Sequence, residues 1–575
     1  MKIAVHIGGT DTERMLARQA LTAGECEVRS IDGGSIGCLQ GLFEERDGNL
    51  LAMTGTPLDI PDFSQIRDYR DAMRWLPQCN GAFAALYWDA ANRKLVAVTD
   101  FLGFKPLYLR RGPGELRLSS DMRAMPGAPD PAGWGAFIAL GHTIGDRTLI
   151  EGVERVRPAT ILVYDVAADR LEQEQYWRWP TPAGSRSSET ADGDGLVEGL
   201  RHSVAEYAKY GDPGTVLLSG GFDSRLILFL LKEAALTPRA TIVSHRDEFL
   251  DADGRLAAAI AGRAKLPYDR VFSSQHFFSS EAFLDYLVAS DASTPSLYLF
   301  ISQIAQFVGD SAVWEGVVPG YTLTVPHQPP GGFKAYLAQE CKGRDAPIWR
   351  AAAVLFRRQA VEAMYEGFRT DLQAEMSKYA DDGFGVSEFI VRNRMRNRTS
   401  INPYKVYENR VRAFTPGMTR AYWDIAGTLS YDARKQNRFY LDLFRRHFPA
   451  ALAVPILSGN SLVRPSPWSV SFLYNRVLAV AARRAAMHPN VIRRFVPSGA
   501  FPFSYARSRF LDSPLLRAPD DPFLEPGAKI PDQELLGKAA ERLLFHWRAW
   551  HWVQEGRLQE VLSPFLEPAA TPSRS

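Results

Sequence analysis

One segment constrains the fold of the second half of the chain more than any other. Residues 214–218 read Gly-Thr-Val-Leu-Leu, residues 219–224 read Ser-Gly-Gly-Phe-Asp-Ser, and apolar residues then recur at helical spacing over 225–232. The alternation continues with a predicted strand at 239–244 and a predicted helix at 253–266. Strands that alternate with helices form a parallel sheet covered on both faces. We therefore predict a doubly wound α/β domain.

The turn in this segment has the composition of an anion-binding loop. Gly220 and Gly221 let the main chain approach phosphate oxygens, and Ser219 and Ser224 add hydroxyl donors. Asp223 can hold the Mg²⁺ that accompanies pyrophosphate. The spacing is not that of a Walker loop, because no Gly-Lys-Ser/Thr follows the glycines. The alternative is an ordinary strand-to-helix turn in which Asp223 or Ser224 caps the helix.

Three regions can be separated along the chain. Residues 1–180 contain short apolar runs separated by Gly, Pro, Asp and Asn, a pattern typical of closely spaced strands. Residues 181–195 lack apolar anchors and are rich in small polar residues, which predicts a linker. Residues 196–575 carry the α/β pattern, with a further strand predicted at 312–316 and largely helical, Arg-rich sequence toward the end.

Composition narrows the class of protein. The 67 Lys and Arg residues balance the 65 Asp and Glu residues, and a net charge of +2 provides no field to attract nucleic acid. The four cysteines are scattered without a C-x-x-C pair, which argues against a disulfide framework and a zinc site. No segment has the apolar length of a membrane span. We expect a cytoplasmic protein with no nucleic-acid or membrane partner.

Both halves of the chain resemble a known family. Residues 80–89 read Asn-Gly-Ala-Phe-Ala-Ala-Leu-Tyr-Trp-Asp and residues 99–108 read Thr-Asp-Phe-Leu-Gly-Phe-Lys-Pro-Leu-Tyr. These segments, with residues 147–153, are similar to the glutaminase domain of asparagine synthetases. The Ser-Gly-Gly-x-Asp-Ser loop resembles the pyrophosphate loop of ATP pyrophosphatases. The chain is identified as a member of the asparagine synthetase superfamily, which includes β-lactam synthetases, carbapenam synthetases and lasso peptide cyclases.

The resemblance implies a fold and an activity. It implies an α+β sandwich of the N-terminal nucleophile hydrolase type over residues 1–180, and an α/β ATP pyrophosphatase domain, of the adenine nucleotide α-hydrolase type, with helical additions over 196–575. It implies that ATP and Mg²⁺ activate a carboxylic acid as an acyl-adenylate, which an amine captures. The implied partners are ATP, a carboxylic-acid or peptide substrate, and a precursor peptide or a maturation protein.

The resemblance also assigns nucleotide and metal ligands. Leu218 and Ser244, at the ends of their strands, border the adenine, and residues 219–224 hold the phosphates. Asp223 and Glu315 hold Mg²⁺. We name these residues as the candidate ATP site.

Two departures from the family pattern bear on activity. Lys2 stands where the glutamine-using members have their cysteine nucleophile, and an ammonium group cannot attack an amide, so we predict no glutamine hydrolysis. The missing cysteine favours an amine on the acid's own molecule, as in lasso peptide or β-lactam closure. The family's metal-binding aspartate falls on Val318, which leaves Asp223 as the main carboxylate unless Glu315 or Asp253 contributes.

Two further functions stay open at this point. A noncatalytic nucleotide-binding or assembly protein would keep the fold after losing turnover. An ammonia-dependent asparagine synthetase would keep turnover and use free ammonia.

Glu408 is the first of two candidate catalytic residues. It begins a Glu-x-Arg-Val segment whose glutamate pairs with a tyrosine in the β-lactam-forming branch of the family. A salt bridge between Glu408 and Arg410 or Arg412 is the alternative.

Arg464 is the second candidate. It lies in the region where the same branch has a lysine that stabilises the transition state, and a guanidinium group could neutralise developing phosphate charge. Lys405 and Lys435 are rivals that we expect at the surface. The arginines at alternate positions from Arg392 to Arg398 could receive an acidic peptide or a carrier, or could form a solvated helix face.

Overall fold

The computed structural model describes most of the chain. In this part of the chain, no helix has the length and hydropathy needed to cross a membrane. The described residues are 2–9, 11–17, 26–180, 193–244, 252–272, 281–293, 307–309, 311–324, 332–458, 461–463, 521–527 and 529–563.

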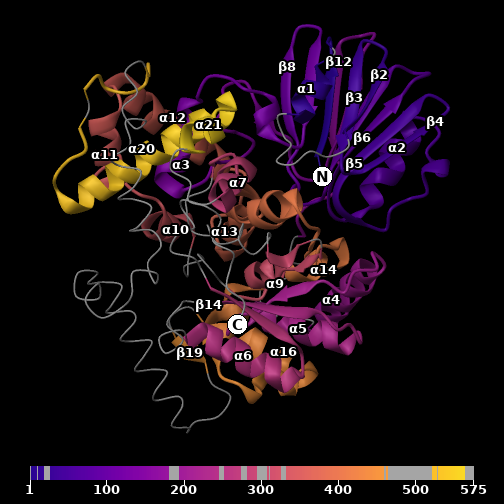
Figure 1. The fold of residues 1–575 in the computed structure, drawn as a ribbon, viewed down its shortest axis with the longest axis vertical. Coiled ribbons are helices and arrows are strands. Elements are labelled where there is room, and N and C mark those ends of the chain that lie inside the picture. Colours follow the sequence, from indigo (N-terminus) through magenta and orange to yellow (C-terminus); the bar gives the residue numbers. More distant parts are fainter. Residues whose placement is uncertain are drawn as a thin grey trace.

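Two six-stranded antiparallel sheets form the N-terminal region (Figure 1). The first has the order β10-β8-β9-β1-β3-β2 and the second β12-β11-β7-β6-β5-β4. The strands of the first sheet are β1 (Lys2–Ile7), β2 (Cys26–Ile31), β3 (Gly34–Leu39), β8 (Tyr108–Gly112), β9 (Glu115–Ser119) and β10 (Glu154–Arg155). Those of the second are β4 (Leu42–Arg46), β5 (Asn49–Leu58), β6 (Asn80–Asp89), β7 (Lys94–Thr99), β11 (Thr160–Asp165) and β12 (Arg170–Gln175).

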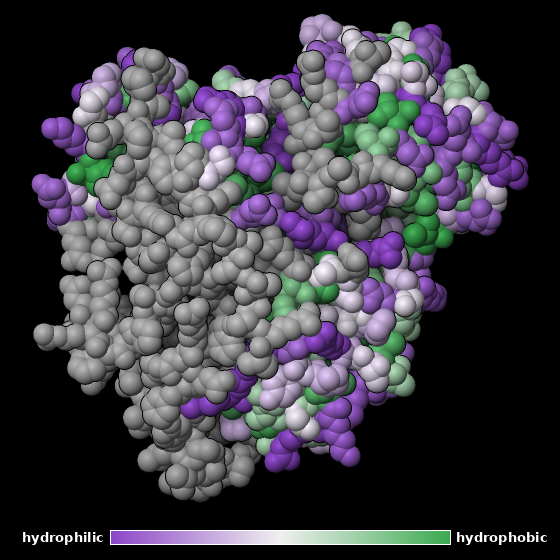
Figure 2. Space-filling view, viewed as in Figure 1, coloured by the Kyte–Doolittle hydropathy of each residue, from purple (hydrophilic) through white to green (hydrophobic). Residues whose placement is uncertain are grey.

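The two sheets pack face to face. Alternate residues of β1, namely Ile3, Val5 and Ile7, are buried between the sheets, as the two-residue period of a strand requires. The short helices α1 (Thr12–Ala17) and α2 (Tyr69–Trp75) cover the outer faces. In Figure 2 hydrophilic residues lie along the outer edge of this region. The α+β sandwich expected over residues 1–180 is confirmed, with a helix on the outer face of each sheet.

A five-stranded parallel sheet forms the second region. Its order is β15-β14-β13-β16-β17, so the chain runs outward from β13 on one side and then returns to add β16 and β17 on the other. In sheets of this kind ligands bind beyond the carboxyl ends of the strands where the order reverses, here between β13 and β16. The strands are β13 (Thr215–Leu217), β14 (Arg239–Ser244), β15 (Tyr268–Phe272), β16 (Val313–Trp314) and β17 (Ala413–Phe414).

The helices predicted at 225–232 and 253–266 are present beside this parallel sheet, as Asp223–Glu233 and Ala252–Ala264. The linker prediction differs in one respect. Helix α4 begins at Gly193, so residues 193–195 form its first turn and do not belong to the predicted linker; residues 181–192 lie outside the described part of the chain. The helices near the sheet are α4 (Gly193–Ala208), α5 (Asp223–Glu233), α6 (Ala252–Ala264), α9 (Val317–Thr322), α14 (Arg420–Ala426), α15 (Tyr431–Arg434) and α16 (Arg438–His447).

A helical layer joins the N-terminal and C-terminal parts of the chain. Helix α3 belongs to the first 180 residues, yet its Trp134 packs against Trp547 and Trp550, with ring centroids 4.6 and 5.5 Å away. A Cβ atom at Gly135 would lie 1.8 Å from the carbonyl oxygen of Met364, so this close helix contact requires glycine. The helices of this layer are α3 (Pro131–Leu140), α7 (Glu281–Ala289), α10 (Phe333–Glu340), α11 (Pro347–Leu355), α12 (Arg358–Met376), α13 (Gly383–Ile390), α20 (Glu534–Glu555) and α21 (Leu558–Leu562).

The arginine-rich run lies in a π-helix, η5 (Val391–Thr399), and a second π-helical turn, η6 (Asn402–Val406), follows. Arg394 and Arg396 are buried, so a fully solvated helix face is the wrong interpretation for these two residues. π-Helical segments are rare and occur frequently at functional sites.

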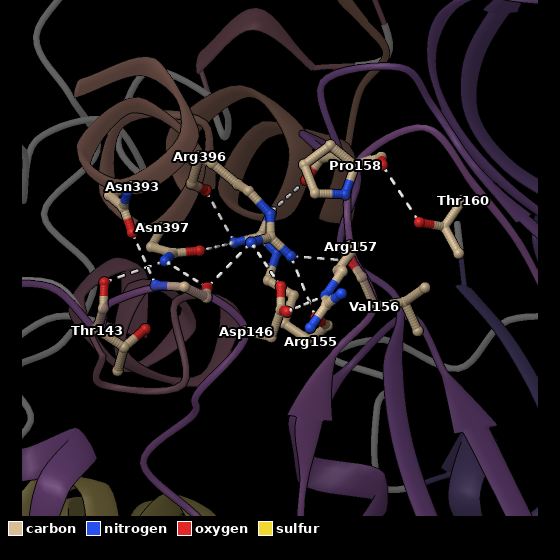
Figure 3. Close-up of polar contacts among 12 residues, drawn as sticks. Thr143, Asp146, Arg155, Val156, Arg157, Pro158, Thr160, Asn393, Arg396 and Asn397 are labelled. Carbon is tan, nitrogen blue, oxygen red and sulfur yellow. Dashed lines mark hydrogen bonds and ion pairs between the residues drawn. The ribbon is translucent and has the colours of Figure 1, made fainter. Parts of the chain in front are cut away.

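Two arginines lock this π-helix to the N-terminal region (Figure 3). The guanidinium group of Arg396 donates to the main-chain oxygens of Gly145 at 2.9 Å, Arg155 at 3.2 Å and Val156 at 2.8 Å. The guanidinium group of Arg155 donates in return to the main-chain oxygens of Arg396 and Gly103, both at 2.8 Å. Burial lowers the pKa of Arg155 to about 10, and the nearby charge of Arg396 adds to this effect. We call this pair the arginine lock.

Arg396→Met tests the lock. We expect it to lower the free energy of unfolding by about 3 kcal/mol, because the carbonyl oxygens of Arg155 and Val156 stay buried and lose their donors. Guanidinium chloride unfolding followed by tryptophan fluorescence measures the change. The control is Arg157→Met, whose side chain is 62% exposed and pairs with Asp146 at 2.7 Å; it should cost less than about 1 kcal/mol. Equal effects of the two variants would contradict the lock.

Candidate functional site

The loop after β13 is held in shape by its own side chains. The Ser224 hydroxyl oxygen accepts from the Ser219 amide at 3.0 Å and lies 2.9 Å from the Ser219 hydroxyl, which accepts from the Gly221 amide at 3.2 Å. The Gly220 amide donates to Oδ1 of Asp253 at 2.9 Å. One amide of the loop is therefore already directed at a carboxylate oxygen, as expected of an anion-binding turn.

The Asp223 side chain does not cap helix α5 and instead contacts Tyr440. The N-cap position of α5 makes no side-chain hydrogen bond, so the predicted alternative of an Asp223 or Ser224 cap is wrong. Oδ1 of Asp223 accepts from the Tyr440 hydroxyl at 2.8 Å. A Cβ atom at Gly320 would lie 2.8 Å from Oδ2 of Asp223, and one at Gly316 would lie 3.0 Å from its Cβ. Glycine at both positions therefore lets the main chain pack directly against Asp223, where a larger residue would collide with it.

Glu315 directly follows β16 and brings a second carboxylate to the same place. Burial, with a smaller contribution from the charge of Asp223, raises the pKa of Glu315 to about 7, although hydrogen bonds from the Gly316 and Val317 amides act in the opposite direction. Burial likewise raises the pKa of Asp223 to about 6, against the hydrogen bond from Tyr440. Two buried carboxylates that disfavour each other's charge fit a divalent cation, which relieves both penalties. We call Asp223 and Glu315 the carboxylate pair.

The structure says less about the other residues that were predicted for the ATP site or its metal. Ser244 ends β14, the neighbour of β13. The Leu218 side chain is buried in the hydrophobic core, so only its main chain can face a ligand. Val318 is fully buried, and an apolar side chain fills the position where the family has an aspartate. Arg464 lies outside the described residues.

Glu408 contacts the N-terminal region. Its buried carboxylate pairs with Nζ of Lys105, which also donates to the main-chain oxygen of Tyr404 at 3.0 Å. Arg410 pairs instead with Asp285. The predicted salt bridge of Glu408 therefore exists with a different partner, 303 residues away in the sequence.

A buried ion cluster surrounds Lys2. Nζ of Lys2 lies 2.9 Å from Oδ2 of Asp121, and Arg123 pairs with Asp121 at 2.8 Å and with Asp291 at 3.5 Å. Asp291 also pairs with Lys405, which is 1% exposed, so the expectation of a surface Lys405 is wrong. Burial lowers the pKa of Lys2 to about 8, and Asp121 opposes this shift. These five residues join strands of the sandwich to the C-terminal part of the chain.

A second group of potential metal ligands lies at the surface and is less suited to a metal ion than the carboxylate pair is. Asp59, His202 and Glu206 place ligand atoms within 4.8 Å of one another. However, both carboxylate oxygens of Glu206 accept from Lys209 at 2.6 Å. The lysine competes with any cation there.

Residues 70–177 match the glutamine amidotransferase domain family. The carboxyethyl-arginine beta-lactam-synthase of Streptomyces clavuligerus is 31% identical over 148 residues, 25% of this chain and 27% of that protein. The glutamine-hydrolyzing asparagine synthetase 3 of Bacillus subtilis is 27% identical over 167 residues, 27% of this chain and 26% of that protein. Over these stretches the chain is similar to members of the asparagine synthetase superfamily. The sandwich contains the part of the chain that matches the glutamine amidotransferase domain family.

One further relative and one solved structure are similar to this chain but say less about its family. Amidase chyE of Penicillium rubens is 28% identical over 158 residues, 26% of this chain and 23% of that protein. The matched stretches span about a quarter of the length of these three relatives. The solved structure of the glutamine phosphoribosylpyrophosphate amidotransferase from B. subtilis, complexed with ADP and GMP, is 10% identical and covers 64% of this chain and 92% of that chain, with a TM-score of 0.22. A score this low does not establish a shared fold.

Asp223→Asn tests the carboxylate pair. The raised pKa values mean that the folded protein without metal holds these protons more tightly, so its stability falls as the pH rises from about 4 to about 7 and stays low above that. The asparagine keeps the oxygen that accepts from Tyr440 and removes the charge. We expect the metal-free variant to unfold at a higher temperature than the wild type at pH 8, and to lose the stabilisation that Mg²⁺ gives the wild type.

Scanning calorimetry with and without Mg²⁺ measures both effects. The matched control is Asp442→Asn on α16, which removes a surface carboxylate that is 60% exposed and pairs with Arg445 at 2.6 Å. A wild type that Mg²⁺ does not stabilise would contradict the metal role.

Proposed function

We propose that this protein is an ATP-dependent amide-forming ligase that activates a carboxylic acid as an acyl-adenylate and releases AMP and pyrophosphate. One observation carries the proposal. The Ser219–Ser224 loop and the carboxylate pair meet at the carboxyl ends of the neighbouring strands β13 and β16, where the strand order reverses. The low-identity relatives named as a β-lactam synthase and asparagine synthetases support the same class of reaction.

The residues of the site would divide the work as follows. The loop amides and the hydroxyls of Ser219 and Ser224 bind phosphate oxygens, while the main chain at Leu218 and Ser244 borders the adenine. Asp223 and Glu315 hold Mg²⁺, which when bound neutralises negative charge on the phosphates. The acid's carboxylate oxygen forms a bond to the α-phosphorus as the bond to pyrophosphate breaks. The amine then attacks the acyl carbon, loses a proton, and AMP leaves.

We propose that the amine is not supplied by glutamine. The Lys2 side chain is buried and ion-paired with Asp121, so it has neither the chemistry nor the freedom of a nucleophile. The amine is then free ammonia or a group on the acid's own molecule. Glu408, held by Lys105, and Arg464 remain the proposed catalytic residues.

Nucleotide binding without turnover is the second candidate function. The observation that favours it is Val318, because an apolar side chain fills the position of a family aspartate and leaves two carboxylates for the ion.

ATP–pyrophosphate exchange separates the two candidates. With Mg²⁺ and a panel of acids that includes aspartate and peptides, we expect incorporation of labelled pyrophosphate into ATP in the presence of the correct acid. Asp223→Asn should reduce the rate at least about 100-fold, because the Mg²⁺ ion that neutralises the phosphate charge loses its main protein ligand. Asp442→Asn should leave the rate unchanged. Nucleotide binding without exchange across the panel would favour the noncatalytic protein.

Glutamine hydrolysis is a separate test. We expect purified protein with ATP, Mg²⁺ and glutamine to release glutamate no faster than boiled protein, since Lys2 cannot form a covalent intermediate with the amide carbon. Enzymatic determination of glutamate measures the rate. Catalytic release of glutamate would show that the N-terminal region is an active glutaminase.

A further inference from the structure

A cavity of about 380 Å³ lies where the sandwich meets the helical layer. One wall comes from residues between 145 and 160 and from β12, and the other comes from the end of α12, the residues that follow it and the π-helix η5. This volume is typical of sites that bind small molecules. We call this space the junction cavity, and it shares no residue with the Ser219–Ser224 loop or the carboxylate pair.

Asp146 lines the junction cavity and is already paired. Its carboxylate accepts from Nε of Arg157 at 2.7 Å and from a terminal nitrogen of Arg396 at 3.3 Å. Figure 3 shows Asp146 between these two guanidinium groups. A cationic ligand would have to displace one of the two arginines, so this carboxylate is poorly suited to bind one.

Glu375 on α12 lines the cavity and is paired in the same way. It accepts from Nζ of Lys378 at 2.5 Å and from the Tyr379 hydroxyl at 2.6 Å. Burial acts to raise the pKa of Glu375, but the hydrogen bonds from Lys378 and Tyr379 outweigh it and lower the pKa. This carboxylate is therefore charged and already bonded. The third carboxylate of the lining, Glu174 on β12, is exposed.

Hydrogen-bond donors remain on both walls of the cavity. Arg157 uses Nε for its bond to Asp146, and its terminal nitrogens have no hydrogen-bond partner among the described residues. The same holds for Arg392, whose Nε donates to Glu388 at 2.7 Å. Arg396 lines the cavity and is 1% exposed, and its Nε has no partner in the described part of the chain. Buried polar atoms are rarely left unpaired in folded proteins, so this nitrogen points to a ligand.

These contacts define the charge of a suitable ligand. Two of the three lining carboxylates are paired, whereas Arg157 and Arg392 keep unbonded N–H groups within the described part of the chain. Hydrogen bonds between a cation and an anion are about twice as strong as those between neutral groups, so an anion gains most here. Because the donors lie on both walls, a ligand with two anionic groups can bond to both walls at once.

We propose that the junction cavity binds a small organic acid with two anionic groups, one bonded to Arg157 and the other to Lys378 and Arg392. One group is a carboxylate, and the second is a carboxylate or a phosphate ester, since both accept from guanidinium and ammonium groups. The ligand would bridge the two walls beside Arg396, so its binding should stabilise the folded protein. The inference goes beyond the proposed ligase activity and does not depend on it.

Isothermal titration calorimetry of the full chain without ATP tests this inference. The probes are glutarate, which has two carboxylates, and 3-phosphoglycerate, which has a carboxylate and a phosphate. Each probe has a match that lacks one anionic group, glutaramate for the first and glycerol 3-phosphate for the second. We expect at least one probe to bind at least about fivefold more tightly than its match, because the match loses one charged contact. The probe that binds more tightly identifies the second anionic group.

Two variants locate the binding in the junction cavity. Arg157→Gln and Lys378→Gln each change one wall, and these side chains are 62% and 54% exposed, so the fold should persist. Each variant should weaken binding of the preferred probe at least about fivefold. The matched control is Lys209→Gln, because Lys209 is exposed and pairs with a glutamate three residues earlier, as Lys378 does. This control should bind the probe as the wild type does.

Three results would overturn this site. They are equal binding of each probe and its match, unchanged binding in Arg157→Gln or Lys378→Gln, and no binding of either probe at millimolar concentration. Inorganic phosphate that binds as tightly as the preferred probe would overturn the requirement for two anionic groups. Probe binding without pyrophosphate exchange would keep the site and count against the proposed adenylation, whereas exchange without probe binding would keep the adenylation and overturn the site.

Discussion

The arginine lock is the contact on which the relative position of the two halves depends. Arg155 and Arg396 have each lost water around a guanidinium group, and each instead donates hydrogen bonds to main-chain carbonyl oxygens at or beside the other arginine. Both sets of bonds can form together in one relative position of β10 and the π-helix. That position also fixes Thr399 against Tyr321, and through α9 it sets the surroundings of Asp223. The sandwich therefore helps to hold the candidate site in place even though it contributes no phosphate ligand.

The buried ion cluster points to the same role for the N-terminal region. Lys2, Asp121 and Arg123 come from the sandwich, whereas Asp291 and Lys405 come from the C-terminal part of the chain. Removing one member of such a cluster leaves the others buried without compensation, which costs more than the cluster contributes. A chain that has built these pairs around Lys2 would be destabilised by reinstating a small nucleophile there.

The sequence was sufficient to predict those parts of the candidate site whose residues are close together in the chain. The strand, the two glycines and the helix start lie within about ten residues, so the loop and Asp223 could be placed from their order alone. Glu315 could be named only from the family resemblance, which places an acidic residue directly after the strand predicted at 312–316. The contacts of Tyr440 with Asp223 and of Lys105 with Glu408 join residues 217 and 303 positions apart and have no periodicity to reveal them. The burial of Arg394 and Arg396 could not be predicted from the α-helical period, because this segment is a π-helix.

The packing of α3 has a consequence for how the chain folds as it is made. Trp134 and Gly135 leave the ribosome early, but the helix that covers Trp134 carries Trp547 and Trp550 near the other end of the sequence. At roughly 5–20 residues per second, the intervening chain takes on the order of 20–80 s to synthesise. During that time an apolar helix face waits without its partner. The packing around Trp134 is therefore completed only when residues 547–550 have been synthesised.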